Sequence, residues 1–342
     1  MYKYLLIFLL IANVSCFAFD FKVSLNKKTF EDESFDFLIQ KVVDARLNKQ
    51  KPIGTVMVSF SLSNTVGNDS LGYEMNNFFN GKPEMFDAKT KIIIVINQLN
   101  IRYIREKADT TGKKAELEFS IAIDYYLEGG KTCGLLYQQF FKFKKSTSNT
   151  KITKDINKGF SETIKSALID FKKQLKINKK EKGIRRQCNT DSLFQFLANK
   201  PEQVVTNQNI KDGLYFSCKD LYLNNPGAIS NYSFTDSTGL GQRPLIVKVP
   251  DYILERVYAI VKDKRIYIYI GGGNYKEALL EEDGKLFFAD ITSAIISNDT
   301  KASSVPIGVL SSLASTIKQA GTAITTPPDV ILDYETGDLV FR

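Results

Sequence analysis

The chain has 342 residues, enough for two ordinary domains, and its hydrophobic content of 43% indicates that most of it folds. Its formal net charge of +8 comes from lysines spread along the chain, often near acidic residues, so we expect a solvated surface and no nucleic-acid partner. The alternative is a dedicated site for an acidic partner, such as phospholipid headgroups or an anionic glycan. Because the chain has no histidine, Ser-His-Asp triads, Cys-His dyads and histidine-based zinc sites are all excluded.

The N-terminus, residues 1–18, has the three parts of a secretory signal. Lys3 gives the positively charged start, residues 5–12 form a short apolar segment, and Ala18 offers a cleavage site. The apolar run is too short for a transmembrane span, which needs roughly 20 apolar residues. We therefore expect an exported protein, in the periplasm, at the outer membrane or secreted. In the alternative interpretation, lipidation of Cys16 anchors the protein, although Asn13 replaces the leucine usual at such sites.

The first half is typical of an α+β unit. Runs of β-branched and aromatic residues predict strands, and apolar residues at three- and four-residue spacing predict helices. Between 115 and 127, apolar residues alternate with polar ones such as Glu118 and Asp124, which predicts one buried and one solvated face. In chain order we expect strands at 35–43, 53–62, 92–96, 115–127 and 132–143, and helices at 71–79 and 160–175.

The apolar stripe of helix 160–175, which includes Phe160 and Phe171, should cover this sheet. The alternative is that the helix docks to a partner or a membrane surface through its lysines.

Residues 177–187 are the best domain boundary, because they are basic and have no hydrophobic pattern. We expect a solvated linker there; with an N-terminal anchor, the same segment would attract anionic lipid. After it, the sequence predicts a helix at 192–198, short strands at 213–216, 257–261, 265–270 and 286–288, and a terminal hairpin between 330 and 341.

Two further segments have structural interpretations. Residues 271–273 are all glycine, but no lysine-serine pair follows them, so we expect a turn at a strand end rather than a phosphate-binding loop. Residues 302–325 mix small and apolar residues, which predicts a packed or partly mobile helical segment; the alternative is a membrane-binding element.

Signal cleavage leaves three cysteines, which allow three pairings. An oxidising compartment permits one disulfide, and we expect it to join Cys188 and Cys218, because both lie in the second half. Cys133 would then remain as a small buried apolar residue.

Two groups of residues resemble known families. In the first half, residues 42–46 (VVDAR), followed by Ile53 and Gly54, the long strands and the closing helix, resemble the YajG-like envelope lipoprotein domain. In the second half, residues 213–226, 264–268 and 332–337 resemble an uncharacterised family of exported proteins of Gram-negative bacteria. Both resemblances imply two domains and an envelope location, and neither implies a catalytic residue.

We therefore expect an α+β protein with two domains, 19–176 and 188–342, each a mainly antiparallel sheet with one or two covering helices. The expected function is a non-enzymatic binding or assembly module of the cell envelope, acting on an unidentified envelope protein or ligand. One alternative is a carboxylate-based enzyme acting on envelope or extracellular glycans, which needs two converging Asp or Glu side chains. The other is a membrane-tethered accessory lipoprotein with peripheral membrane contact.

The sequence assigns no catalytic, cofactor-binding or metal-binding residue, since it has no calcium loop, nucleophile elbow, or phosphate- or dinucleotide-binding motif. Four residues are expected to matter for structure. Asp44 and Arg46 should pair with neighbouring groups at a strand end, and Gly213 and Gly337 should occupy turns.

Overall fold

The structure is a computed structural model, and it shows an α+β chain with a mixed sheet in the first half and an antiparallel sheet in the second. The predicted signal segment, Cys16, residues 302–325 and Gly337 lie outside the described residues. None of the helices in the described ranges combines the length and apolar character of a membrane span. The structure describes residues 21–49, 53–59, 62–67, 71–81, 90–105, 115–148, 151–181, 186–198, 204–206, 208–227, 233–236, 245–248, 256–271, 274–281, 284–288, 330–334 and 338–341.

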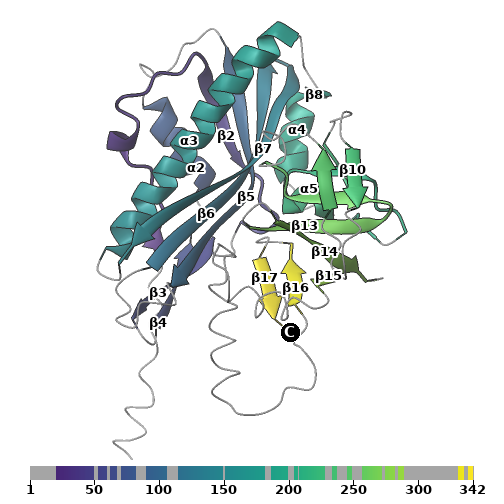
Figure 1. Ribbon diagram of the computed structural model, residues 1–342. Helices are drawn as coiled ribbons and strands as arrows, with labels where there is room; N and C mark the ends of the chain where they lie inside the picture. The colour runs from purple at the N-terminus through teal and green to yellow at the C-terminus, as the bar shows by residue number, and fades with distance from the viewer. Residues whose placement is uncertain are drawn as a thin grey trace, which may run out of the picture.

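The mixed sheet has the strand order β1-β4-β3-β5-β6-β7-β8, with β2 paired to β5 as a branch (Figure 1). β5 and β6 are long because β-branched and aromatic residues continue through them without an interior glycine or proline. The elements of the first half are β1 Phe21–Lys22, η1 Lys27–Thr29, β2 Leu38–Asp44, β3 Gly54–Ser59, β4 Leu62–Gly67, α2 Leu71–Asn80, β5 Lys91–Arg105, β6 Ala115–Gly129, β7 Thr132–Thr147, α3 Ile152–Glu181, β8 Arg186–Asn189 and α4 Thr190–Ala198.

The first two predicted strands do not pair with each other. β2 lies parallel to the first part of β5, and β3 lies parallel to the later part, with Gly54 opposite Ile101. A Cβ at position 54 would lie 2.0 Å from the Ile101 carbonyl oxygen, so only glycine permits this close approach. The predicted strand at 53–62 corresponds to β3, and β4, which forms a hairpin with β3, is not predicted from the sequence. The expected antiparallel pairing is thus right for β5 to β8 and wrong for β2 and β3.

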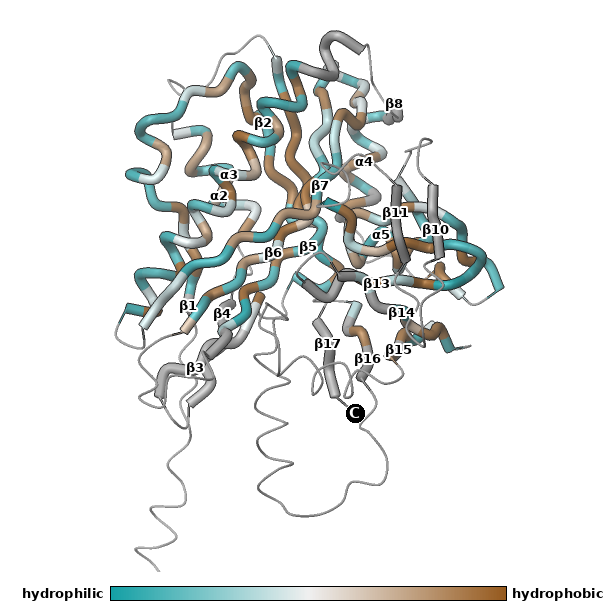
Figure 2. The backbone as a smooth tube through the Cα atoms, viewed as in Figure 1, coloured by the Kyte–Doolittle hydropathy of each residue, from teal (hydrophilic) through white to brown (hydrophobic). Residues whose placement is uncertain are grey.

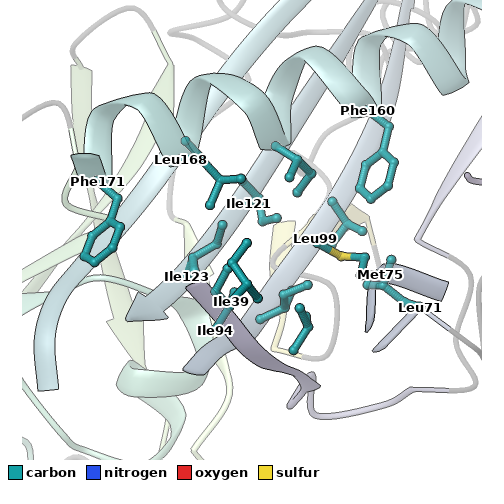
Figure 3. Close-up of a cluster of buried hydrophobic side chains, with 14 of the residues drawn as sticks. Ile39, Leu71, Met75, Ile94, Leu99, Ile121, Ile123, Phe160, Leu168 and Phe171 are labelled. Atoms are coloured by element: carbon teal, nitrogen blue, oxygen red, sulfur yellow. The ribbon is translucent and has the colours of Figure 1, made fainter. Parts of the chain in front are cut away.

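α3 and α2 cover one face of the mixed sheet and bury the main hydrophobic core. Figure 3 shows Phe160, Leu168 and Phe171 of α3 above the strand residues Ile121 and Ile123. The ring of Phe171 stacks on the buried Tyr125 ring, with centroids 4.1 Å apart. Figure 2 shows the apolar residues concentrated along the central strands that this helix crosses. The predicted apolar face of the helix is therefore confirmed.

A segment near the N-terminus, residues 23–34, runs alongside α3, and we call it the strap. The backbone N–H of Ser24 donates to Asn157 Oδ1 at 3.0 Å, and that of Asn26 donates to Ser161 Oγ at 2.7 Å. α3 is therefore held between the sheet and the strap.

Asn76 of α2 occupies the outer edge of β2, which pairs only with β5 among the described strands. Its Oδ1 accepts from the backbone N–H of Val42 at 2.7 Å, and its Nδ2 donates to the Val42 carbonyl at 2.7 Å and to the Gly72 carbonyl at 2.6 Å. One side-chain amide thus takes the place of a neighbouring strand and protects the edge from pairing with another chain.

The first half extends further along the chain than the sequence predicts. α3 continues to Glu181, β8 pairs with β7, and α4 packs on the opposite face of the sheet, where Leu197 contacts Ile93 and Val95. The predicted boundary at 177–187 therefore falls inside the first half, which reaches Ala198.

The second half is built on an antiparallel sheet with the order β17-β16-β15-β14-β13-β12-β9. The β12–β13 turn has Asp263 and Lys264 at φ 51° and 62°, the left-handed conformation of tight hairpin turns. The predicted strands and the terminal hairpin are confirmed, with ends shifted by a few residues. The elements are β9 Gly213–Tyr215, α5 Cys218–Tyr222, β10 Ser233–Asp236, β11 Leu245–Lys248, β12 Ala259–Lys262, β13 Arg265–Gly271, β14 Asn274–Leu280, β15 Leu286–Phe288, β16 Val330–Asp333 and β17 Asp338–Phe341; β10 and β11 pair separately.

Candidate functional site

The second half packs on the face of β6 that the sequence predicts to be solvated. Glu118 and Asp124 are only 2% and 8% exposed, so that prediction is wrong. Ala122 on the same face belongs to a hydrophobic cluster whose other members come mostly from the second half. Phe140 of β7 joins this cluster, and its ring meets the Tyr258 ring edge-on with centroids 5.4 Å apart.

Polar and charged side chains gather where the two halves meet, and we call this group the seam. It comprises Asp44, Arg46, Gln98 and Asp124 of the first half and residues 217–220 of the second. Every charged member except Asp44 is less than a tenth exposed as a whole residue, and the Asp44 side chain is 9% exposed. Buried charges are costly unless they are paired and hydrogen-bonded, so the partners of each member define what the seam does.

Asp44 and Arg46 form a two-point ion pair at the end of β2. Arg46 Nε donates to Asp44 Oδ1 at 3.0 Å, and Nη2 donates to Oδ2 at 2.8 Å. Arg46 Nη2 also donates to the Lys49 carbonyl oxygen at 3.3 Å. The expected pairing at the strand end is confirmed, with the two residues as each other's partners, and it fixes the backbone that enters the seam.

The short helix α5 brings the second half into the seam. Ser217 caps it: the Ser217 hydroxyl accepts from the Asp220 N–H at 2.9 Å and lies 2.7 Å from Asp220 Oδ2. The next residue, Cys218, donates its backbone N–H to Gln98 Oε1 at 3.1 Å. The capped turn therefore binds directly to β5.

Among the hydrogen bonds of the seam, the one made by Lys219 joins the residues farthest apart in the sequence. Its Nζ donates to the carbonyl oxygen of Ala45 at 2.5 Å, and the residue is 5% exposed. Burial lowers the Lys219 pKa to about 8, and the negative charges of Asp220, Asp124 and Asp44 oppose this shift. A lysine with this pKa could act as a base or nucleophile in an open site. Here the ammonium group is instead held on a backbone carbonyl between the two halves.

A second polar contact lies at the edge of β7. The carbonyl of Arg256 accepts from the Phe140 N–H at 3.0 Å, and its guanidinium reaches around the edge to Asp170 of α3, with Nη2 3.0 Å from Oδ1. Tyr137 donates its hydroxyl to Asp170 Oδ2 at 2.9 Å, and its ring centroid lies 5.2 Å from the Arg256 guanidinium carbon. Arg256 thus fastens the second half to both a strand and the covering helix.

The cysteines differ from the prediction. Cys218 is free and buried, whereas Cys133 is disulfide-bonded, so the expected Cys188–Cys218 bond is wrong. The physical reason is that β8 belongs to the first sheet, where the backbone register places Cys188 directly opposite Cys133. We infer Cys188 to be the partner of Cys133.

The remaining residues singled out from the sequence contribute little to this site. Gly213 is the first residue of β9 and not part of the predicted turn, because it pairs with Val261 of β12. Gly337 and Cys16 lie outside the described residues. Within the described ranges, no three His, Cys, Asp or Glu side chains form a group suited to a metal ion.

Sequence reasoning missed Lys219, Gln98 and Arg256. A local signal existed only for α5, because residues 217–220 (SCKD) place an acidic residue three positions after a serine, as at a capped helix start.

No protein-family model and no curated protein matches the chain. One solved structure that it resembles is a crystal structure of the Xanthomonas campestris protein XCC0632, described by the family model DUF330. The match covers 48% of this chain and 99% of that chain, with 9% sequence identity and a TM-score of 0.30. The likeness lies in the first half, and it transfers no residue role or function. These comparisons do not support the family resemblance expected for the second half.

Proposed function

We propose that the protein is exported to the cell envelope and acts there as a non-enzymatic binding or assembly module. The observation that carries this proposal is the seam. Asp44 forms an ion pair with Arg46, and Lys219 donates to a backbone carbonyl. Charged groups that an enzyme would present to a substrate are therefore buried between the halves. This arrangement supports a protein whose two halves form one fixed surface for a partner.

The disulfide at Cys133 supports the envelope location, because disulfides persist in oxidising compartments and are rare in the cytosol. The test is the intact mass of the protein purified from its own envelope, with and without reductant. We expect the mature chain to begin at Phe19. Reduction should add the mass of one hydrogen to each of the two cysteines of a single disulfide. An acylated Cys16 would favour the tethered lipoprotein, and a retained signal segment without a disulfide would overturn export.

The proposed assembly role is tested by cross-linking intact cells and sizing the complexes that contain the chain. We expect a defined species larger than the 38.6 kDa chain itself. Purified protein should also leave envelope glycans intact. Glycan turnover that is lost in the variant Asp124→Asn would overturn the proposal in favour of a carboxylate-based enzyme.

A further inference from the structure

The exposed residues of α3 are almost all lysines. Over residues 152–176, where side-chain exposure is described, the helix exposes Lys154, Lys158, Lys173, Lys176 and only one other residue, Thr153. All other positions in this range are buried or half-buried.

These lysines lie on one side of the helix. Together with the half-buried Lys165 and Lys172, the exposed Lys154, Lys158 and Lys176 follow one another at spacings of four, seven, seven and four residues, which return to the same face, and Lys173 lies next to Lys172. At 1.5 Å per residue, the row extends for about 33 Å. We call it the lysine stripe: Lys154, Lys158, Lys165, Lys172, Lys173 and Lys176.

The strap runs alongside the stripe and pairs with its two half-buried members. Glu33 lies 3.2 Å from Lys165 Nζ, and the Ser34 carbonyl accepts from Lys172 Nζ at 2.6 Å. The exposed lysines at the two ends of the stripe remain open to solvent. The strap thus pairs with the middle of the stripe and leaves the charge of its ends in place.

The ends of the stripe carry an excess of positive charge. Lys154, Lys173 and Lys176 form no ion pair with any residue in the described ranges, and Lys158 lies 3.8 Å from Glu162 in the next turn. Like charges at three- and four-residue spacing repel one another on a helix. An anionic partner would relieve this repulsion.

η1 of the strap adds two exposed lysines to this face, and the two exposed acids that follow offset their net charge. Lys27 and Lys28 are exposed on η1, which packs against α3, and the exposed acids Glu31 and Asp32 follow in the strap. The ammonium groups form an extended row, whereas a single phosphate or carboxylate requires donors that converge on one point. An extended row of positive charge fits a flat anionic surface.

We propose that the lysine stripe and η1 bind the anionic headgroups of a lipid bilayer. The proposal rests on the envelope location proposed above and deepens it by naming the surface that the protein contacts.

The experiment measures co-sedimentation of the Cys16→Ser protein, which cannot be acylated, with two kinds of vesicle. One contains only phosphatidylcholine, and the other is phosphatidylcholine mixed with phosphatidylglycerol. We expect binding to the anionic vesicles alone, and weaker binding as added salt shortens the screening length. Equal binding to both vesicles, or none to either, would overturn the proposal.

Charge reversal tests whether the stripe is responsible. Each basic residue near an anionic surface strengthens binding about fivefold, so reversing four should weaken binding at least about 100-fold. The stripe variant carries Lys154→Glu, Lys158→Glu, Lys173→Glu and Lys176→Glu. The matched control carries Lys91→Glu, Lys131→Glu, Lys211→Glu and Lys264→Glu, four exposed lysines outside α3 and η1. Equal losses in both variants would show a general effect of net charge and refute a specific surface.

Lysine acetylation of the unsubstituted surface gives a second readout that does not depend on a variant folding. Anionic vesicles should protect Lys154 and Lys176 from the reagent and leave Lys211 and Lys264 reactive. Equal acetylation of all these lysines in the presence of vesicles would refute the proposal. The proposal would also be refuted if an acidic peptide protected Lys154 and Lys176 and the vesicles did not. Export is measured separately by intact mass, so an exported protein that fails to bind vesicles refutes this surface and leaves the location standing.

Discussion

Replacing Lys219 with methionine tests whether its ammonium group is truly withdrawn from water in the seam. Methionine has a similar length and no charge, so the substitution keeps much of the packing and removes the charge on the Ala45 carbonyl. The informative quantity is the difference in unfolding free energy between the wild-type protein and Lys219→Met, followed as a function of pH.

The size of the effect follows from the lowered pKa. Because a tenfold change in proton affinity corresponds to about 1.4 kcal/mol, the fall in the Lys219 pKa from 10.5 to about 8 is equivalent to about 3 kcal/mol. Between these two pH values, the unfolded chain binds the lysine proton and the folded chain has released it. Stability therefore rises with pH in this interval, and below the folded pKa this lysine contributes no pH dependence.

We expect wild-type stability, relative to Lys219→Met, to increase by up to about 3 kcal/mol as the pH rises from about 8 to 10.5. Urea unfolding followed by circular dichroism is the appropriate assay, since the chain has no tryptophan. Burial also raises the pKa of Tyr125, but that titration occurs in both proteins and cancels in the difference. Lys211→Met, at an exposed lysine, is the matched control and should leave the pH dependence unchanged. Parallel pH profiles for wild type and Lys219→Met would mean that water reaches this lysine, and the account of the seam would fail.

Three further substitutions test the first half. Peptide mapping without reductant should recover Cys133 linked to Cys188, and a Cys188–Cys218 peptide would contradict this pairing. The substitution Cys133→Ser should lower the unfolding free energy by about 2–4 kcal/mol. Asn76→Leu removes the amide that bonds the edge of β2, so we expect a loss of about 2–3 kcal/mol and faster amide exchange at Val42. Unchanged exchange there would refute the proposed edge protection. Gly54→Ala should destabilise by about 1–3 kcal/mol, because its methyl group would collide with a β5 carbonyl; an unaltered thermal midpoint would disprove that contact.

The elements that follow local periodicity could be predicted from the sequence. Phe160 and Phe171 lie on one face of helix α3 because a regular helix repeats every 3.6 residues, whatever surrounds it. The β12–β13 hairpin likewise follows from a local turn between two apolar runs. Such elements can be predicted because the residues that determine them lie within a short stretch of the sequence.

The features that depend on distant residues could not be predicted. The polar face of β6 is typical of a solvated surface, and Asp124 is buried where residues 217–220, more than ninety positions later, pack near it. The pairing of β2 and β3 with β5 depends on strand topology, which alternating hydrophobicity does not encode. The burial of Lys219 has no local signal at all, because an isolated lysine is nearly always exposed.

The strap has a consequence for the proposed export. Its contacts with α3 join residues separated by 133 and 135 positions, so they cannot form until strands β1 to β7 and helix α3 have been made. Folds with such long sequence separations form slowly, because the entropy of closing large loops must be overcome before the contacts stabilise the chain. If the protein is exported as proposed, this delay would keep the chain open while it crosses the membrane.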